Sequence, residues 1–386
     1  MPDIAVRQSI ITSAYIHIPF CSHKCEFCDF AAVAGLSHLE DEYTDIICRE
    51  IEQRVARINS PIKLSTVFFG GGTPGLASPD NLKRIFETLK RVAPIDDSIE
   101  FSIETTPHAI TEEKAKAWRE FGINRISIGI ESLQDSELKA IGRDHTRGQA
   151  LAGLEIASSY FSNINVDFMY ALPTQTVESW GKTLEELVSL TKQYPSIKHV
   201  SSYCLELAVN SPLLSRFPRA SDAYPVDDSV AVLFEMLVET LTNAGFVHYE
   251  VSNFALPNFL CEHNLVYWRN KQYLAFGVGA HRYVEGYRSA NSKSLKKYMR
   301  DCMADEMSEF IDSATEIKEA LMLGLRMREG IDVREFEESY GVNIARVFEK
   351  QIDKLKSGGF IDFDGQHLRI TDAGVLISNL VLTEFM

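Results

Sequence analysis

The sequence predicts an α/β fold built on a parallel β-sheet, followed by a smaller helical domain. Short apolar runs and helical patterns alternate six times within about the first 245 residues, which is typical of right-handed βαβ units. Beyond about residue 305, helical patterns and one hairpin signal replace this alternation. Periodicity alone leaves a partial barrel and an open doubly wound sheet as alternatives.

The expected elements follow in chain order. Pro19 ends the first strand, and Pro79 is suited to open the second helix because proline is favoured at the first helical position. Strands are expected at residues 13–18, 64–69, 99–104, 124–129, 163–168 and 197–203. The helical patterns that follow them occupy residues 39–58, 78 onward, 111–121, 147–160, 176–192 and 227–244.

The regular alternation fails after the first predicted domain, residues 1–245. Residues 246–305 are rich in aromatic residues, glycine and asparagine, and are interpreted as a linking segment. In the last domain, residues 306–386, Asp364-Gly365 predicts a hairpin turn, and the pattern is winged-helix-like. Its acidic composition favours a packing or docking surface over DNA binding. Helices are expected there at residues 314–326, 332–340 and 343–357 and after Thr371.

Composition excludes several classes of protein. The formal net charge is −15 and the sequence shows no basic stripe, so no nucleic-acid partner is expected. No apolar run approaches the 18 or more residues of a membrane span, and residues 1–13 lack a signal-peptide pattern. Seven scattered cysteines in 386 residues indicate a reducing cytoplasm and not a disulfide framework.

Three of these cysteines lie close together after the first strand. Cys21, Cys25 and Cys28 have the spacing C-x3-C-x2-C. Three thiolates leave one iron of a [4Fe–4S] cubane without a protein ligand, and an open metal position can activate a bound molecule. A structural zinc site would need a fourth ligand, such as His17 or His23. Inert thiols are the remaining alternative.

A glycine-rich turn, residues 70–74 with the sequence GGGTP, follows the second strand directly. Consecutive glycines allow backbone amides to approach a ligand closely, although the turn alone also fits a simple βα connection. Together with the three-cysteine loop it resembles the radical S-adenosylmethionine (SAM) superfamily. That resemblance implies a partial (β/α)6 TIM-like barrel that binds a [4Fe–4S] cluster and SAM.

Further motifs resemble the coproporphyrinogen dehydrogenase-like (HemN) group. They are residues 15–21, 124–129, 167–173 and 277–281. Within the group, three features resemble the haem chaperone branch, HemW. Phe30 replaces a further cysteine, only a short segment precedes Tyr15, and residues 263–268 match the motif HNxxYW that is associated with haem binding.

The resemblance implies a role for each matching residue. Cys21, Cys25 and Cys28 would ligate the cluster. Haem would be bound by His263, Asn264, Tyr267 and Trp268. SAM would be contacted by Tyr15, Phe27, Gly71, Gly72, Thr73, Glu104, Glu131, Arg143 and Asp167. The group usually has glutamine at the position of Glu131, and an ionised glutamate can only accept hydrogen bonds.

Structural interpretations of the same residues stay open. Glu104 ends an apolar strand, where a carboxylate is costly unless it is paired. Arg143 could form a salt bridge with Asp144, and Asp167 could cap the next turn. The HNxxYW motif could be an aromatic core patch with a hydrogen-bonded histidine. Cys261, near that motif, could instead serve as a further soft ligand.

The resemblance implies a cytoplasmic haem chaperone, peripheral at the membrane, that delivers haem to membrane haemoproteins and can form a homodimer. No catalytic residue is assigned in this interpretation. The alternative is an oxygen-independent coproporphyrinogen III oxidase of porphyrin biosynthesis. It would use SAM cleavage to decarboxylate propionates to vinyl groups, giving protoporphyrinogen IX. A zinc-stabilised binding module is a third hypothesis.

Overall fold

A curved sheet forms the centre of the protein in this computed structural model, which describes residues 10–386 except 208, 210 and 220. The strand order is β11-β1-β4-β5-β6-β7-β8-β10-β9. All six predicted strands are confirmed and run parallel: β1 (Ile11–Ile18), β4 (Ile62–Gly71), β5 (Ile95–Thr105), β6 (Arg125–Glu131), β7 (Ile164–Tyr170) and β8 (Ile197–Cys204). In the described residues β11 and β9 are the two edges, so the barrel is partial.

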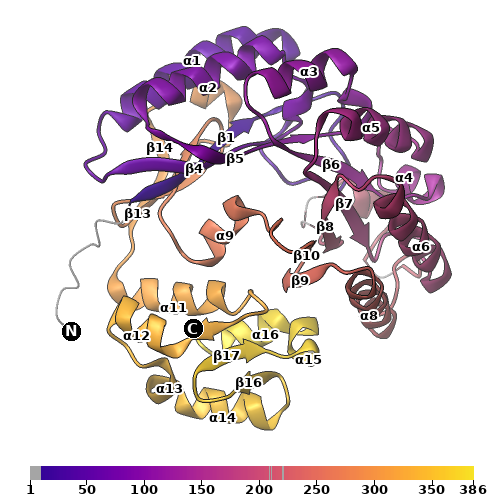
Figure 1. Ribbon diagram of the computed structural model, residues 1–386, viewed down its shortest axis with the longest axis vertical. Coiled ribbons are helices and arrows are strands. Elements are labelled where there is room, and N and C mark those ends of the chain that lie inside the picture. The colour runs from indigo at the N-terminus through magenta and orange to yellow at the C-terminus, as the bar shows by residue number, and fades with distance from the viewer. Residues whose placement is uncertain (1–9, 208, 210, 220) are drawn as a thin grey trace.

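Helices cover the convex outer face of the sheet (Figure 1). Each buries an apolar stripe, as the full burial of Trp118 and Trp180 shows. Threonine caps that accept backbone hydrogen bonds begin three of them, at Thr111, Thr146 and Thr176. The helices are α1 (Glu40–Val55), α2 (Pro79–Val92), α3 (Glu112–Glu120), α4 (Asp135–Ala140), α5 (Arg147–Tyr160), α6 (Val177–Gln193) and α8 (Asp227–Asn243). The short α7 (Leu213–Arg216) instead lies beside Glu26, whose carbonyl accepts from Leu213 N.

The segment interpreted as linking, residues 246–305, supplies both edges of the main sheet. β11 (Leu274–Phe276) pairs parallel with β1. At the opposite end of the sheet, β10 (Asn253–Ala255) pairs antiparallel with β8, and β9 (Val247–Glu250) pairs antiparallel with β10. Between them, α9 (Glu262–Trp268) lies on the concave side of the sheet (Figure 1). A second sheet contains β12 (His281–Val284), β13 (Tyr287–Asn291) and β14 (Asp305–Phe310), with α10 (Leu295–Arg300) before β14. The domain boundaries at 245 and 305 stay predictions.

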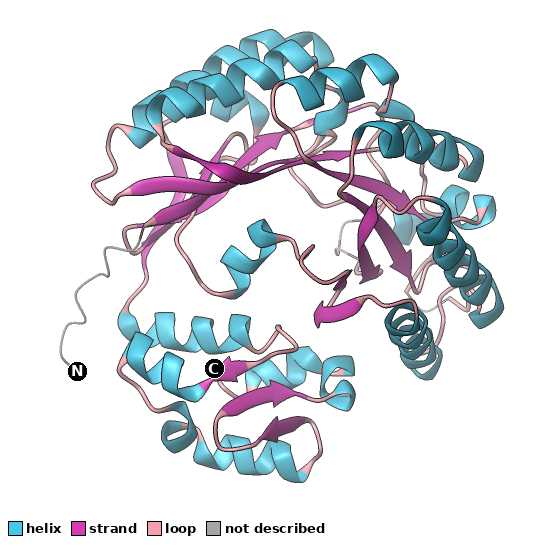
Figure 2. Cartoon of the chain, in the orientation of Figure 1, coloured by secondary structure: helices cyan, strands magenta, loops and turns pink. Residues whose placement is uncertain are grey.

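The C-terminal part is a three-stranded sheet flanked by helices, as Figure 2 shows. The hairpin is confirmed, and Gly365 takes the left-handed conformation (φ +93°) that its turn needs. The single helix expected at 343–357 is wrong: two helices meet at Phe348, whose ring packs against Phe385. The elements are α11 (Ser313–Gly324), β15 (Ile331–Asp332), α12 (Val333–Tyr340), α13 (Ile344–Val347), α14 (Glu349–Ser357), β16 (Ile361–Phe363), β17 (His367–Ile370), α15 (Asp372–Leu376) and α16 (Ser378–Thr383). Across the described residues, no helix has the length and apolarity to cross a membrane.

Candidate functional site

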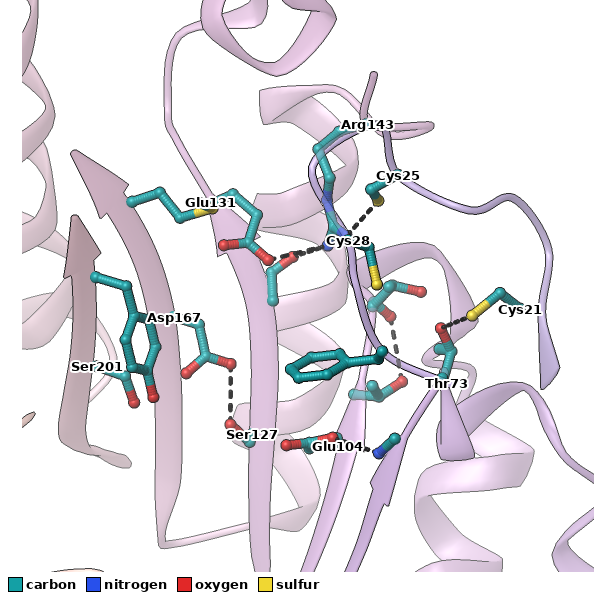
Figure 3. A pocket seen from close by; sticks show the side chains of 18 of the residues that line it. Cys21, Cys25, Cys28, Thr73, Glu104, Ser127, Glu131, Arg143, Asp167 and Ser201 are labelled. Carbon is teal, nitrogen blue, oxygen red and sulfur yellow. Dashed lines mark hydrogen bonds and ion pairs between the residues drawn. The ribbon is translucent and has the colours of Figure 1, made fainter. Parts of the chain in front are cut away.

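A cavity of about 370 Å³ opens at the carboxyl ends of the parallel strands, where ligands bind in folds of this type. Most of the residues predicted to bind the cluster or SAM line it, although they come from distant parts of the sequence (Figure 3). The predicted residues on its wall are Cys21, Cys25, Phe27, Cys28, Gly71, Gly72, Thr73, Glu104, Glu131, Arg143, Asp167 and Asn264. Tyr15, His263, Tyr267 and Trp268 lie elsewhere.

Cys21 ends the short strand β2 (Phe20–Cys21), and Cys25 and Cys28 lie on the loop that connects β2 to its partner β3 (Val33–Ala34); we call residues 21–32 the cysteine loop. Thr73 Oγ1 donates to Cys21 Sγ at 3.6 Å, and Arg143 Nη1 donates to Cys25 Sγ at 3.2 Å. Burial raises the pKa of all three thiols, while the Arg143 charge opposes this at Cys25. The site therefore supplies donors that would stabilise thiolate ligands.

The spread of the three sulfurs distinguishes between the metal hypotheses. A single Zn²⁺ with Zn–S bonds of about 2.3 Å would hold tetrahedral sulfurs about 3.8 Å apart. In the described part of the chain, the three Sγ atoms are not gathered within 4.8 Å of one another. In a cubane cluster each cysteine sulfur binds a different iron, so the three sulfurs can lie farther apart than around one zinc ion. The arrangement fits a [4Fe–4S] cluster better than one zinc ion.

The glycine turn after β4 needs its glycines. Gly71 has φ +115°, a conformation that L side chains rarely adopt, and its N–H donates to Glu104 Oε2 at 3.0 Å. A Cβ on Gly72 would lie 2.5 Å from the carbonyl oxygen of Pro19. The turn therefore presents bare backbone beside the cysteine loop, where a ligand can approach closely.

Four carboxyl groups and two guanidinium groups share the cavity wall: Glu104, Glu131, Asp144, Asp167, Arg125 and Arg143. Burial, aided by the Asp167 charge, raises the pKa of Glu104 to about 7. Burial and Asp167 likewise raise the pKa of Glu131 to about 7 against the opposing effect of Arg143. With a pKa of about 7, Glu104 and Glu131 are only partly ionised at pH 7. A cationic ligand would bind more tightly to their ionised form.

Arg143 connects the cysteine loop to the end of β6. Besides Cys25, its guanidinium donates to the Gly129 carbonyl at 2.6 Å and lies 3.5 Å from Glu131 Oε1. The neighbouring Asp144 instead accepts from Ser22 Oγ at 2.7 Å. The simple Arg143–Asp144 salt bridge is therefore not the main contact of this guanidinium.

Asp167 belongs to a polar network on the cavity wall. It accepts from Ser127 Oγ at 3.0 Å (Figure 3) and from Asn165 Nδ2 at 2.6 Å. Asn165 Oδ1 in turn accepts from Ser201 at 3.1 Å. These contacts orient the carboxyl group toward the cavity, so its place is explained without a turn-capping role.

The donor set of the cavity fits SAM. A sulfonium and an ammonium group suit the carboxyl groups, and an amino-acid carboxylate suits a guanidinium. The Nε atoms of Arg125 and Arg143 are buried and have no hydrogen-bond partner within the described residues. Such orphaned donors are rare unless something else satisfies them. The backbone at Glu131 is also left-handed (φ +67°), a strain that concentrates at functional sites.

The side chains of the HNxxYW motif face different parts of the protein, and His263 lies in a buried polar and aromatic environment. His263 is buried, with Nδ1 3.0 Å from the hydroxyls of Ser13 and Thr66, and Nε2 2.9 Å from Tyr267 OH. Burial lowers the pKa of His263 to about 3. In this structure it is a hydrogen-bonded histidine in an aromatic patch, which was the structural interpretation of the motif.

The other members of the motif occupy three separate places. Asn264 lines the main cavity, and Tyr267 lines a second cavity together with Tyr15. Trp268 packs against a small buried cluster that contains Leu265 and Met327. The neighbouring Cys261 is fully buried, with Sγ 3.7 Å from Glu100 Oε1.

Sequence reasoning missed several residues that line the main cavity. Arg125 is the residue that the sequence signals most clearly, because it is a cation inside an otherwise apolar strand. A buried cation costs free energy unless it is paired. The others give no such signal, because serine, asparagine and aromatic residues are common in strands and loops. They include Phe68, Ser127, Asn165, Met169, Ser201 and Tyr203.

Glu104 predicts a pH-dependent stability in the ligand-free protein. Its pKa of about 7 in the folded chain, against 4.5 ordinarily, means that the folded state binds the proton more tightly. The resulting stabilisation is complete below pH 4.5 and is lost as the pH rises through 7. Glu104→Gln should remove the contribution of Glu104 to this dependence and raise the free energy of unfolding at pH 8 by about 3 kcal/mol, while Glu131, whose pKa is also raised to about 7, keeps its own contribution.

Urea unfolding at pH 5.5 and pH 8 measures this effect. Glu112→Gln, which changes an exposed glutamate on α3, serves as the control and should leave the wild-type pH dependence intact. Equal pH dependence in Glu104→Gln and wild type would contradict the assigned pKa.

Comparisons with known proteins agree with this geometry. The family model described as the radical SAM superfamily matches residues 15–187, and the HemN C-terminal domain model matches residues 311–377. The solved structure of the coproporphyrinogen III oxidase HemN from Escherichia coli superposes with a TM-score of 0.85 at 23% identity. It covers 99% of this chain and 92% of that one, which shows a shared fold.

Relatives of known name align along almost the whole chain. Heme chaperone HemW from Bacillus subtilis is 33% identical, over 97% of this chain and 99% of that protein. HemW from Lactococcus lactis is 32% identical, over 97% of each chain. The mitochondrial radical S-adenosyl methionine domain-containing protein 1 of Danio rerio is also 32% identical, over 99% of this chain and 87% of its own length. The chain therefore belongs to the radical SAM superfamily and, within it, to the HemW family of HemN-related proteins.

Proposed function

We propose that this protein is a haem chaperone, which binds haem together with a [4Fe–4S] cluster and SAM and delivers haem to membrane haemoproteins. The observation that carries the proposal is the near full-length similarity to several proteins named heme chaperone HemW. Similarity over both the barrel and the C-terminal domain supports a shared role more strongly than a match to the barrel alone, which many reactions use.

The main cavity would hold the cluster and SAM. Cys21, Cys25 and Cys28 would ligate three irons, and the carboxyl groups and Arg143 would orient SAM beside the open iron. The bound pair supplies one-electron chemistry in this superfamily. The residues of the chain would exclude water, bind the charged ends of SAM and hold the cysteine loop against the β4 turn through the contact of Thr73 with Cys21.

The second candidate is oxidative decarboxylation of coproporphyrinogen III. The shared fold with HemN favours it as an alternative. Phe30 weakens it, because this side chain replaces a cysteine of the HemN enzymes, is 62% exposed beside the cluster loop and cannot exchange protons. In the chaperone function, an exposed aromatic ring at this place is instead suited to contact a porphyrin.

A haem-transfer assay tests the proposal. The cluster-reconstituted protein would be loaded with haem under anaerobic conditions and mixed with membranes from haem-starved cells that contain apocytochromes. Holocytochrome formation, followed by reduced-minus-oxidised difference spectra, should be faster than with the same concentration of free haem. A rate equal to that of free haem would contradict the chaperone function.

A further inference from the structure

Two histidines and one aspartate come together beside the carboxyl ends of β5 and β6. His108 lies on the short 3₁₀ helix Pro107–Ala109 that follows β5, and Asp144 and His145 lie between α4 and α5. One ligating atom of each side chain lies within 4.8 Å of a ligating atom of each of the others. We call these three residues the His–Asp cluster. Within the described part of the chain, it is the one such group that is gathered closely enough to hold a metal ion.

His145 contributes an unpartnered nitrogen from a buried ring, since the residue is only 4% exposed. Its Nε2 lies 3.1 Å from the carbonyl oxygen of Ile130 on β6. A carbonyl oxygen can only accept, so Nε2 carries the proton and Nδ1 keeps a lone pair. Nδ1 is buried and has no hydrogen-bond partner among the described residues. An imidazole whose other nitrogen donates to a backbone carbonyl is typical of a metal-binding histidine.

His108 supplies a second unpartnered nitrogen. Its Nδ1 is also buried without a hydrogen-bond partner in the described residues, and it lies 3.6 Å from Asp144 Oδ1. This separation is too long for a hydrogen bond. It is close to the separation of two ligands around a tetrahedral ion, about 3.4 Å for bonds of about 2.1 Å. The His108 side chain is 22% exposed, which gives an ion a path from solvent.

Asp144 completes the cluster with a carboxylate whose two oxygens have different surroundings. Oδ2 accepts from Ser22 Oγ at 2.7 Å, and Oδ1 faces His108. The guanidinium of the neighbouring Arg143 is directed to Cys25 Sγ and the Gly129 carbonyl. An ordinary ion pair between His108 and Asp144 would not account for the buried, unpartnered Nδ1 of His145, because such groups are rare unless something satisfies them.

From this arrangement we infer that the His–Asp cluster binds one divalent transition-metal ion of the Zn²⁺ or Fe²⁺ type, separate from the [4Fe–4S] cluster. The ligands are His108 Nδ1, His145 Nδ1 and Asp144 Oδ1. Two imidazoles and one carboxylate suit such ions and leave further coordination positions open. Small rotations of the partly exposed His108 and Asp144 side chains close the set around the ion. The inference does not depend on the proposed haem function.

An ion at this site would also stabilise the cysteine loop. Ser22 follows Cys21 directly, and its hydroxyl donates to Asp144. An ion that fixes the Asp144 carboxylate therefore fixes the first residues of the loop. A ligand that binds only the folded state raises its stability, so Zn²⁺ should raise the midpoint of thermal unfolding in wild type and not in a variant without the His–Asp cluster.

Equilibrium dialysis of the cluster-reconstituted full chain against micromolar Zn²⁺, without oxygen, tests the inference, with bound zinc and iron measured together. Wild type should hold one zinc ion per chain besides the cluster iron. His145→Ala and His108→Ala should each weaken zinc binding on the order of a hundredfold or more, since the outer partners of metal ligands are already worth about 10–100-fold. Iron content should stay unchanged. His38→Ala, which removes an exposed histidine outside the His–Asp cluster, is the matched control.

X-ray absorption at the zinc edge identifies the ligands independently. Nitrogen and oxygen neighbours at about 2.0–2.1 Å, without sulfur, support the inference; sulfur at about 2.3 Å would place zinc in the cysteine loop and overturn it. Zinc binding that is absent in wild type, or unchanged in both histidine variants, would overturn it as well. Thermal unfolding without zinc verifies that each variant is folded, and the partly exposed His108 provides the test if His145→Ala does not fold.

Discussion

Replacing Cys25 with serine is expected to abolish the [4Fe–4S] cluster. A serine hydroxyl does not match the soft thiolate ligand that iron–sulfur clusters require. Cys25 also accepts the Arg143 hydrogen bond at 3.2 Å, so its loss disturbs the contact between the cysteine loop and β6. After anaerobic reconstitution, the variant should lack the brown charge-transfer absorbance and hold little iron and sulfide.

Cys48→Ser provides the matched control for this experiment. Cys48 lies on α1, outside the cysteine loop, and is partly buried like Cys25. This variant should bind a full complement of iron and sulfide. A complete [4Fe–4S] spectrum in Cys25→Ser would refute the ligand assignment.

Replacing Glu50 with alanine is expected to destabilise the fold by about 3–5 kcal/mol. The Glu50 carboxylate is fully buried and joins α1 to the segment after β11. It accepts from Arg54 Nε and Asn291 Nδ2, each at 2.7 Å, and from Tyr298 OH at 2.7 Å and Gly277 N at 2.8 Å. Alanine would leave these buried donors without their partner, which costs more than the loss of the carboxylate itself.

Urea unfolding at pH 7 measures the effect of this change. Glu52→Ala is the control on the same helix, because Glu52 is exposed and pairs only with the exposed Arg91 in the contacts of the described chain. It should cost less than about 1 kcal/mol. Similar losses of stability in the two variants would show that Glu50 does not hold the two segments together.

The regular part of the fold could be predicted because each of its elements carries its own local signal. An apolar run and an amphipathic helix repeat from β1 to α8, and such patterns fix parallel βα units. The three outer strands contributed by residues 246–305, β9, β10 and β11, are three or four residues long, which is too short to show a period. Their place depends on pairing with β8 and β1, which are distant in sequence.

The candidate site likewise contains residues that the sequence predicted and residues that it did not. The cysteine loop and the glycine turn are local motifs, so the sequence predicted them together. Arg125 and Asn165 face the cavity only because neighbouring strands bring them there. The HNxxYW motif shows the converse, because residues that are adjacent in the sequence face different surroundings. On α9, His263 faces Ser13 while Tyr267 faces the second cavity. No linear pattern indicates which side chain of a short helix faces which cavity.

The central claim is that the protein carries haem and does not convert a porphyrin precursor. One anaerobic experiment tests it most directly: cluster-reconstituted protein with SAM, reductant and coproporphyrinogen III, assayed for protoporphyrinogen IX, with haem binding titrated in parallel. We predict stoichiometric haem binding and no protoporphyrinogen IX. Formation of protoporphyrinogen IX with turnover would contradict the claim and identify a coproporphyrinogen III oxidase despite Phe30.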